Sequence, residues 1–482
     1  MKTLASILVA LLLAAPAFAL TDVTLLHFSD YHSHALPFFS EGKLDQGGVA
    51  RAVRYMREER SKGAIVLSGG DMINRGSPAW SDKYRCAEWA WFDGAVDAMA
   101  FGNHDADYGF DEYCRCAASI KYPILSANTS GMTKWSVIRR GGVTVGVFAI
   151  AGSDFTLLVK VPELKFSDPV AAAREAVTAL REVEKVDVVV MIGHESTDDD
   201  FALARQVPGI DVIFGTHSHF KQELMQIPDS GTWFISPYQY LTYISCVVLR
   251  FDGKKLIDVR GGLVPVNATM RPDRKIAKQV TAMQKALERD PEYRELFRVI
   301  GRVERPISID DHNVRDSALG DLVLDLMRSS SGADVALSTA SSFRGGLAEG
   351  PVTLEDLHAA LPYDNAILVY PMKGDALKKL LTYAAAQSGS DSFAQVSGVS
   401  FHVTRPAEAK VAGAPIDPER TYRVATTDYL GRIARGYSGF FAGIEPTDSG
   451  KRVRDELRRY ISMQSPVSAN ADGRIEARRQ PE

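Results

Sequence analysis

Cysteine is scarce in this sequence, and neither sign of charge is in large excess. Four cysteines occur in 482 residues, too few for the disulfide framework of a small secreted domain. The absence of a C-x-x-C pair argues against a metal held by cysteine. Lysine and arginine number 56 against 60 aspartate and glutamate, a formal net charge of −4. Without a basic surplus, we expect no nucleic acid polymer as a partner.

Long hydrophobic runs are missing beyond the N-terminus. An apolar run from Leu4 to Ala15 follows a single lysine, and Ala17-Phe18-Ala19 supplies the small residues of a cleavage site. This pattern predicts a signal peptide over residues 1–19, a mature chain from Leu20, and export to the periplasm or the extracellular space. A retained anchor is the alternative, but the run is short for a bilayer span. We expect no transmembrane segment in the mature chain.

An exported protein can form disulfide bonds. Cys86 with either Cys114 or Cys116 is the candidate pair. Four cysteines allow three complete pairings, and the sequence does not choose among them.

The chain alternates β-branched runs with amphipathic helical stretches, which predicts a layered α/β fold. Strands are expected at 23–26, 64–67, 97–101, 186–192 and 211–214, a helix at 49–60, and a hairpin within 242–266 around Asp252-Gly253. A charged helical stretch at 272–297 indicates a linker helix between domains, with a surface helix of either domain as the alternative. The predicted domains are 20–268 and 299–465, joined by a linker at 269–298 and followed by a frayed polar tail at 466–482.

Polar residues follow each predicted strand of the first domain. The motifs are Asp30-Tyr31-His32, Gly69-Gly70-Asp71, Gly102-Asn103-His104-Asp105-Ala106-Asp107, Gly193-His194 and Gly215-Thr216-His217-Ser218-His219. In α/β sheets, ligands bind outside the carboxyl ends of the strands. Burying so many polar side chains together without a partner is costly. The five loops therefore predict a metal centre.

Taken in order, these motifs resemble those of the calcineurin-like metallophosphoesterases, and more closely the 5′-nucleotidase and UDP-sugar hydrolase family. Asp105 stands where that family usually has Glu, and Thr216 is an extra residue between Gly215 and His217. The resemblance implies an N-terminal four-layer α/β metallophosphoesterase sandwich and a second, smaller α/β (α+β) substrate-binding domain. It extends past residue 300 and so covers nearly the whole mature chain.

The resemblance also implies two divalent metal ions. One set of ligands would be Asp30, His32, Asp71 and His219; Asp71 would bridge to a second ion, held also by Asn103, His194 and His217. Imidazole and carboxylate ligands suit Zn, Mn, Fe or Co. Two such ions about 3.5–4 Å apart share a hydroxide and clamp a phosphoryl group for in-line attack. With only two carboxylates as anionic ligands, the centre stays positive and attracts a phosphate dianion.

A catalytic dyad of His104 and Asp107 matches the family motif. Asp107 would orient the imidazole, and His104 would meet the phosphoryl oxygens or the leaving group. The alternative is that His104 only supports the Asn103 loop. His34 is expected beside the metal centre, without a chemical role. Asn128 resembles part of a family motif, and a structural cap is an equal alternative for it.

The second domain is where the family binds the nucleoside. Tyr363 and Tyr429 would stack the base, Asn365 would bond its edge, and Arg344 would meet phosphate. Three departures stand out: the Thr339–Arg344 loop has lost the usual asparagine and glycines, Asp321 replaces Asn or Arg, and Arg435 replaces the aspartate that holds the ribose hydroxyls. A cation accepts no hydroxyl hydrogen bond, so Arg435 would instead bind an additional anionic group.

These expectations predict an exported dinuclear-metal phosphomonoesterase that hydrolyses nucleoside 5′-monophosphates or related small phosphoesters. Two alternatives remain open. One is a non-nucleotide hydrolase of the same fold, acting on sulfur esters, nucleotide sugars or cyclic phosphodiesters. The other is a non-catalytic surface binding protein whose metals are structural.

Overall fold

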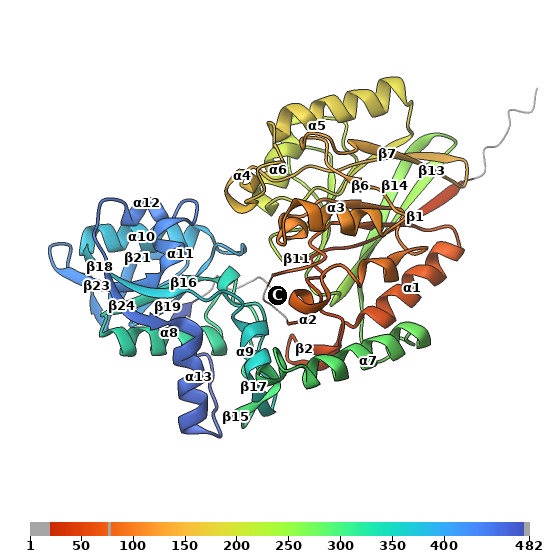
Figure 1. Cartoon of the computed structure of the whole chain (residues 1–482). Helices are drawn as coiled ribbons and strands as arrows, with labels where there is room; N and C mark the ends of the chain where they lie inside the picture. Colours follow the sequence, from red (N-terminus) through yellow and green to blue (C-terminus); the bar gives the residue numbers. More distant parts are fainter. Residues whose placement is uncertain (1–19, 76–78, 477–482) are drawn as a thin grey trace, which may run out of the picture.

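The computed structural model describes residues 20–75 and 79–476. The chain forms two lobes, with the N-terminal lobe drawn in red to green and the C-terminal lobe in blue tones (Figure 1). The predicted signal peptide, 1–19, lies outside the described residues. Within them, no helix combines the length and the apolar character needed to cross a bilayer.

The N-terminal lobe contains two six-stranded sheets packed face to face. The first sheet has the order β14 (Lys255–Pro265), β13 (Tyr243–Asp252), β1 (Thr21–Phe28), β4 (Ile65–Ser68), β5 (Ala98–Ala100), β6 (Ile124–Leu125). The second has the order β11 (Lys221–Gln226), β12 (Trp233–Pro237), β10 (Val212–Phe214), β9 (Val188–Met191), β8 (Val143–Phe148), β7 (Trp135–Arg140). A buried aliphatic core, which includes Leu25, Ile65, Val190 and Val247, fills the space between them.

Helices cover the outer face of each sheet. Those on the first sheet include α1 (Val49–Ser61) and α3 (Phe110–Ala118), and those on the second include α5 (Pro169–Thr178) and α6 (Thr197–Gln206). The result is the predicted four-layer α/β sandwich. The expected strands and the hairpin are confirmed with end shifts of at most two residues, as is the helix that begins at Val49.

The long helix α7 (Arg274–Arg289) belongs to the surface of the first lobe. Ile276, Val280 and Leu287 are buried in the core beneath α1 and beside α2 (Ala79–Tyr84). The Asp273 side chain caps its N-terminus by accepting hydrogen bonds from the amides of Lys275 and Ile276. The stretch predicted as a linker helix is therefore packed along the first domain, and the linker bounds 269–298 stay a prediction.

The second lobe is built on a five-stranded sheet. Its order is β19 (Ala394–Ser397), β16 (Val335–Thr339), β23 (Thr421–Thr427), β18 (Ala366–Lys373), β24 (Thr447–Arg452). The helices α8 (Ala318–Ser331) and α13 (Val453–Gln464) pack on one face, and α10 (Gly374–Ala386) packs on the other. A second sheet contains β22 (Ala414–Pro415), β21 (Arg405–Val411), β20 (Val399–His402) and β25 (Ile475–Glu476).

Short elements complete the chain. The strands are β2 (Phe38–Ser40), β3 (Lys43–Gln46), β15 (Val299–Val303) and β17 (Gly350–Thr353), and the helices are α4 (Phe155–Leu158), α9 (Leu354–Ala360), α11 (Asp428–Arg432) and α12 (Ser438–Phe441). Four short 3₁₀-helices also occur: η1 (Trp89–Phe92), η2 (Asn103–Ala106), η4 (Arg294–Phe297) and η5 (Ala340–Ser342). The segment η3 (Ala179–Val183) is a short π-helix.

The expectation of a frayed tail from residue 466 is wrong as far as residue 476. Val467 and Ile475 are buried, and β25 pairs in parallel with β20. Arg474 reaches back to Asp321, with Nε 3.3 Å from Oδ1. A tail rich in polar residues is ordered here because two of its apolar residues, Val467 and Ile475, and Arg474 contact buried partners. Residues 477–482 lie outside the described part.

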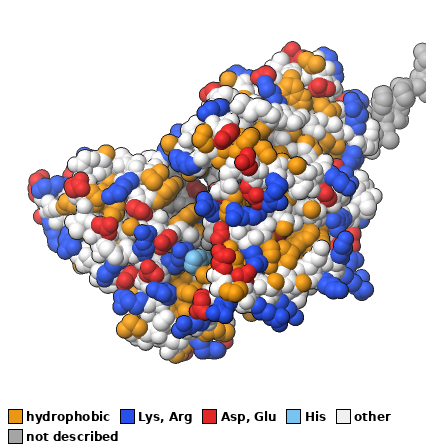
Figure 2. Space-filling model, in the orientation of Figure 1, with side chains coloured by type: hydrophobic (Ala, Val, Ile, Leu, Met, Phe, Trp, Pro, Cys, Tyr) orange, Lys and Arg blue, Asp and Glu red, His pale blue; other side chains and the backbone are white. Residues whose placement is uncertain are grey.

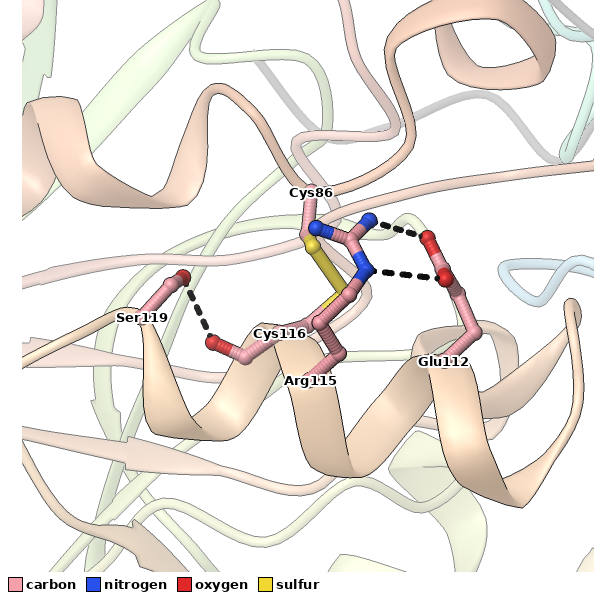
Figure 3. Close-up of a disulfide and its surroundings, with 5 residues drawn as sticks. All are labelled: Cys86, Glu112, Arg115, Cys116 and Ser119. Carbon is pink, nitrogen blue, oxygen red and sulfur yellow. Dashed lines mark hydrogen bonds and ion pairs between the residues drawn. A yellow bond between two sulfur atoms is a disulfide. The ribbon is translucent and has the colours of Figure 1, made fainter.

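The structure chooses one of the two candidate disulfides. Cys86 is bonded to Cys116 of α3, next to the Arg115–Glu112 ion pair (Figure 3). Cys114 is free and exposed, and Cys246 is free and half-buried. Helical geometry explains the choice, because residues two apart on α3 point to different sides.

Candidate metal centre

The loops that carry the predicted ligands meet at one edge of the sandwich. β1, β4 and β5 are parallel neighbours in the first sheet, and β9, β10 and β12 are parallel neighbours in the second. Both sets present their carboxyl ends at the same edge, where ligands of α/β sheets bind. The predicted convergence of Asp30, His32, Asp71, His104, His194, His217 and His219 is therefore observed.

Five of these residues have left-handed backbone conformations. The φ angle is 52° at Asp30, 47° at His32, 52° at Asp71, 56° at His217 and 50° at His219. Residues other than glycine adopt this region at a cost of roughly 1–3 kcal/mol each. Backbone strain of this kind concentrates at functional sites. Its occurrence at five residues of this edge therefore indicates that the edge is a functional site.

The first ligand group consists of Asp30, His32 and His219. The His219 Nε2 atom lies 3.2 Å from Asp30 Oδ1 and 3.1 Å from His32 Nε2. Asp30 and His32 are almost completely buried. These are the spacings expected of donor atoms that share one cation.

The second group consists of Asp71, His194 and His217, and Asp71 lies between the two groups. Asp71 Oδ2 is 3.2 Å from His194 Nε2 and 3.6 Å from His32 Nε2. Its carboxylate therefore faces donors of both groups, which is the geometry that the predicted bridging role requires.

Hydrogen bonds fix which nitrogen each imidazole offers. His32 Nδ1 is 3.1 Å from the Ile73 carbonyl oxygen, and His194 Nδ1 is 2.6 Å from that of Gly69. A carbonyl oxygen only accepts, so both Nδ1 atoms carry a proton, and in the neutral form of each ring Nε2 keeps a lone pair. Bonds of this kind set the tautomer and orientation of metal-binding histidines.

Electrostatics keeps two of the imidazoles neutral, which is the metal-binding form. Burial holds the pKa of His32 well below its usual value. Burial together with the Arg344 guanidinium lowers the pKa of His219 to about 4. Burial also disfavours the charged form of His194, but the Asp71 carboxylate outweighs it and raises that pKa to about 9.

Several buried polar atoms that could bind a metal have no hydrogen-bond partner among the described residues. They include Asp30 Oδ1, Asn103 Oδ1 and His194 Nε2. Leaving such atoms unpaired is costly, and each is an atom that the predicted ligand set uses. The residues present therefore fit two divalent cations with imidazole, carboxylate and amide ligands.

The predicted dyad lies beside these groups. His104 Nδ1 is 2.8 Å from Asp107 Oδ2, and the His104 ring packs edge-on against His32. Burial lowers the pKa of His104, but the carboxylates of Asp107 and Asp71 outweigh it and raise the pKa to about 10. His104 also supports the loop, because its backbone amide donates to Asp71 Oδ1 at 2.8 Å.

Asp105, which stands in the usual place of a glutamate, has a scaffolding role. Its carboxylate accepts hydrogen bonds from the amides of Asp71, Met72 and Gly102. A Cβ at Gly102 would lie 2.2 Å from Asp71 Oδ1. The glycine lets the η2 loop approach Asp71, and Asp105 holds it there.

Two of the predicted substrate residues lie next to the centre. Arg344, after η5, donates to the Tyr363 hydroxyl at 3.2 Å. Burial raises the pKa of Tyr363, but Arg344 and His104 act more strongly and lower it. The second lobe reaches the metal edge, because the Arg344 carbonyl oxygen accepts a hydrogen bond from Gln239 at 3.0 Å and Arg344 lines the same cavity as His219. Figure 2 shows the indentation between the lobes, with acidic and basic side chains along its rim.

Tyr429 and Asn365 also belong to the second lobe. Tyr429 is the second residue of α11 and is 39% exposed, close to the 38% of Tyr363, so both side chains are accessible to solvent. Asn365 immediately precedes β18, and its backbone carbonyl accepts from the amide of Val453. Asn365 lines a small cavity together with Tyr363.

Arg435 reaches across to the first lobe. Its Nη1 donates to Ser153 Oγ at 3.2 Å and lies 3.9 Å from Asp199 Oδ2. The side chain is 78% exposed. Asp321, the other changed position, lies away from the metal groups, buried against Asp472 and Arg474, where burial raises its pKa to about 8.

The remaining predicted residues have structural roles. The His34 ring stacks on Tyr240 at 3.5 Å between centroids. The Asn128 side chain bridges the backbone of Ala151 and Ser167, which favours the structural cap over the family motif.

Sequence reasoning missed two residues of this edge. Gln239 follows β12 and accepts a hydrogen bond from His219 Nδ1. Asp154 follows β8, and its Oδ2 lies 3.3 Å from His217 Nε2. The signal for both was the one used for the other loops, a polar residue shortly after a strand of the parallel sheet.

Comparisons with known proteins agree with this geometry. Residues 23–221 match the family model of the calcineurin-like phosphoesterases, and residues 299–442 match that of the 5′-nucleotidase C-terminal domain. The chain belongs to the 5′-nucleotidase family. It is therefore a phosphoester hydrolase of a family that uses divalent metals.

Relatives of this 5′-nucleotidase family member match along nearly their whole length. Protein UshA of Yersinia enterocolitica is 25% identical over 545 residues, covering 98% of this chain and 97% of its own. The 5′-nucleotidase of Rattus norvegicus is 24% identical, covering 98% of this chain and 94% of its own.

Solved structures show the same fold. A 5′-nucleotidase precursor from Thermus thermophilus superposes with a TM-score of 0.76 at 24% identity, over 96% of this chain and 100% of that one. The sulfate thiohydrolase SoxB of Thermus thermophilus has a TM-score of 0.75 at 19% identity, over 95% and 97%. Both likenesses show that this chain has the two-domain fold of these proteins.

Proposed function

We propose that this protein is a dinuclear-metal phosphomonoesterase that hydrolyses nucleoside 5′-monophosphates or closely related small phosphoesters. The observation that carries the proposal is the position of Asp71 between two histidine–carboxylate groups, with the His104–Asp107 pair beside them. Asp30, His32, Asp71 and His219 would hold one cation, and Asp71, Asn103, His194 and His217 the other.

Two divalent cations, with Zn, Mn, Fe and Co as the candidates, would supply Lewis acidity and activate the attacking water. The protein residues do the remaining work. Asp107 holds His104 Nδ1, which leaves Nε2 as the nitrogen that donates a proton to a phosphoryl or leaving-group oxygen. Arg344 lies within reach of the same space and suits a phosphate oxygen because its guanidinium donors form a fork.

Substrate binding in the second lobe rests on Tyr363 and Tyr429. Two partly exposed aromatic rings near a phosphate site suit a flat base between them, with Asn365 at its edge. Arg435 replaces the acidic residue of the family's ribose loop and contacts Ser153 instead. We therefore propose that Arg435 favours substrates with an additional anionic group.

Export is part of the proposal. The signal-peptide pattern of residues 1–19 and the disulfide between Cys86 and Cys116 support it, because disulfides persist in oxidising compartments. Secretion of the full-length chain with an N-terminal sequence that starts at Leu20 tests it.

A hydrolysis panel tests the enzymatic proposal. Mature protein with Mn²⁺ or Zn²⁺ is assayed on 5′-nucleotides, cyclic nucleotides, nucleotide sugars, simple phosphomonoesters and thiosulfate esters. Release of phosphate from 5′-nucleotides at the highest kcat/KM supports the proposal. A preference for sulfur esters points to the non-nucleotide alternative, and binding of two ions with no turnover on any ester points to the structural-metal alternative.

A further inference from the structure

Gln239 connects the metal edge of the first domain to the second domain. It follows β12 and is only 3% exposed. Its side-chain Oε1 accepts a hydrogen bond from His219 Nδ1, and its Nε2 donates to the backbone carbonyl oxygen of Arg344 at 3.0 Å. One amide therefore touches a predicted metal ligand and a residue of the opposite lobe.

The Arg344 carbonyl determines how this amide is oriented. A carbonyl oxygen can only accept, so the NH₂ group of Gln239 must face it. The amide oxygen then faces His219, and that oxygen can only accept the Nδ1 proton. His219 is thereby held in the tautomer whose Nε2 lone pair points toward Asp30 Oδ1, 3.2 Å away.

His219 differs in this respect from the other two imidazoles. His32 and His194 bond to carbonyls of Ile73 and Gly69, which belong to their own domain. Among these three histidines, His219 alone has its tautomer set through a side chain that is itself oriented by the second domain.

The surroundings allow this link to open. Gln239, His219 and Arg344 line a cavity of about 370 Å³ between the domains, together with Lys221, His312 and Asp391. Open space beside the amide leaves it room to rotate once the Arg344 carbonyl moves away. Relative motion is the general expectation for two domains of one chain.

We call the second domain seated when the Arg344 carbonyl oxygen accepts the hydrogen bond from Gln239 Nε2. We propose that Gln239 is a positioning residue that couples this seated position of the second domain to the metal-binding tautomer of His219. The inference rests on the proposed metal centre. When the second domain is seated, the amide presents its oxygen to His219 and the Asp30-His32-His219 group is ready for a cation. By reciprocity, a cation in that group favours the seated arrangement.

Two variants test the hydrogen-bond acceptor and the hydrogen-bond donor of the Gln239 amide separately. Gln239→Glu keeps an acceptor for His219 but replaces the donor to Arg344 with a carboxylate that the carbonyl repels. Gln239→Met has a similar shape and provides neither. Gln222→Met is the matched control, because its amide bonds only to the Glu223 carbonyl at the surface. Circular dichroism melting verifies that each variant folds.

The readouts are the stoichiometry and affinity of Mn²⁺ by titration calorimetry, and hydrogen exchange of residues 339–345 with and without Mn²⁺. Wild type and Gln222→Met should bind two ions, and Mn²⁺ should slow exchange in this segment. Gln239→Glu should keep Mn²⁺ affinity within about threefold but lose the Mn²⁺-induced protection. Gln239→Met should lose the protection and bind one ion at least 10-fold more weakly.

Other results overturn the coupling. It fails if Gln239→Met binds both ions as wild type does, if Gln239→Glu weakens binding as much as Gln239→Met, or if Mn²⁺ leaves exchange of residues 339–345 unchanged in wild type. Should Gln239→Met not fold, Gln239→Glu decides alone, through retained affinity with lost protection. Wild-type protein that binds no Mn²⁺ would instead reject the proposed centre, and the coupling with it.

Discussion

The Nε2 atoms of His32 and His219 lie 3.1 Å apart, and each ring has its Nδ1 atom bonded to an oxygen. Both facing nitrogens therefore carry lone pairs, which repel at this distance unless a cation or a proton lies between them. The low pKa values of both rings disfavour the proton. The arrangement is best explained by a metal ion.

Metal removal tests this explanation directly. Dialysis against EDTA should abolish phosphate release and lower the melting temperature, because the donor atoms then repel one another without compensation. Addition of Mn²⁺ or Zn²⁺ should restore both. Asp71→Asn should lose metal and turnover together. Unchanged melting and activity after complete demetallation would contradict the proposed centre.

His104→Ala separates the dyad from the metal ligands. Turnover should fall by about 10²–10⁴-fold, as expected for loss of a proton donor, while two ions remain bound. Metal analysis and steady-state kinetics measure the two effects. Loss of metal along with turnover would favour the alternative that His104 only supports the Asn103 loop.

Tyr363→Ala and Tyr429→Ala test the aromatic site. Each should raise KM for a 5′-nucleotide about 2–10-fold, the loss expected for one stacking partner, with little change in KM for a small phosphomonoester. Tyr363→Phe is the control that keeps the ring and removes the hydrogen bond from Arg344. Equal effects on both substrates would argue against base stacking.

Arg435→Ala tests the proposed preference for an extra anionic group. It should raise KM for nucleoside diphosphates or nucleotide sugars more than for monophosphates, because it removes a cation from the leaving-group side. The same substitution removes the contact with Ser153, so Ser153→Ala serves as the control for that contact. A uniform change across substrates would assign Arg435 to interdomain contact alone.

Glu88 predicts a pH dependence of stability. It is buried against the Tyr31 hydroxyl, and burial raises its pKa to about 7 from an ordinary value near 4.5. The folded protein thus binds this proton more tightly than the unfolded chain. The resulting stabilisation is complete below pH 4.5 and is lost as the pH rises through 7.

Glu88→Gln should remove that dependence. Between pH 5 and pH 8, metal-free wild type should lose roughly 1–3 kcal/mol more unfolding free energy than the variant. Urea denaturation at each pH measures the difference, and the exposed Glu58→Gln is the control. Parallel pH profiles of wild type and Glu88→Gln would show that Glu88 titrates normally.

Much of the fold followed from local pattern. Strand positions were predictable because buried strands here are continuous β-branched runs, and the four layers followed from the family resemblance. The tail was mispredicted because Arg474, Val467 and Ile475 have ordering partners that lie more than 60 residues away in the sequence. The choice of Cys116 over Cys114 also needed the orientation of α3 against Cys86.

The same distinction between local sequence pattern and tertiary contacts applies to the metal-binding edge. The sequence by itself determined which residue types follow each strand and so predicted a metal centre, because those motifs are contiguous and follow the strand pattern. The resemblance of the motifs to the family then implied the ligands Asp30, His32, Asp71, Asn103, His194, His217 and His219. Only the tertiary structure decided that Asp154 approaches His217, that Arg435 contacts Ser153, and that Gln239 joins His219 to Arg344. These relationships depend on which side chains from distant loops approach within hydrogen-bond distance, and no local spacing specifies that.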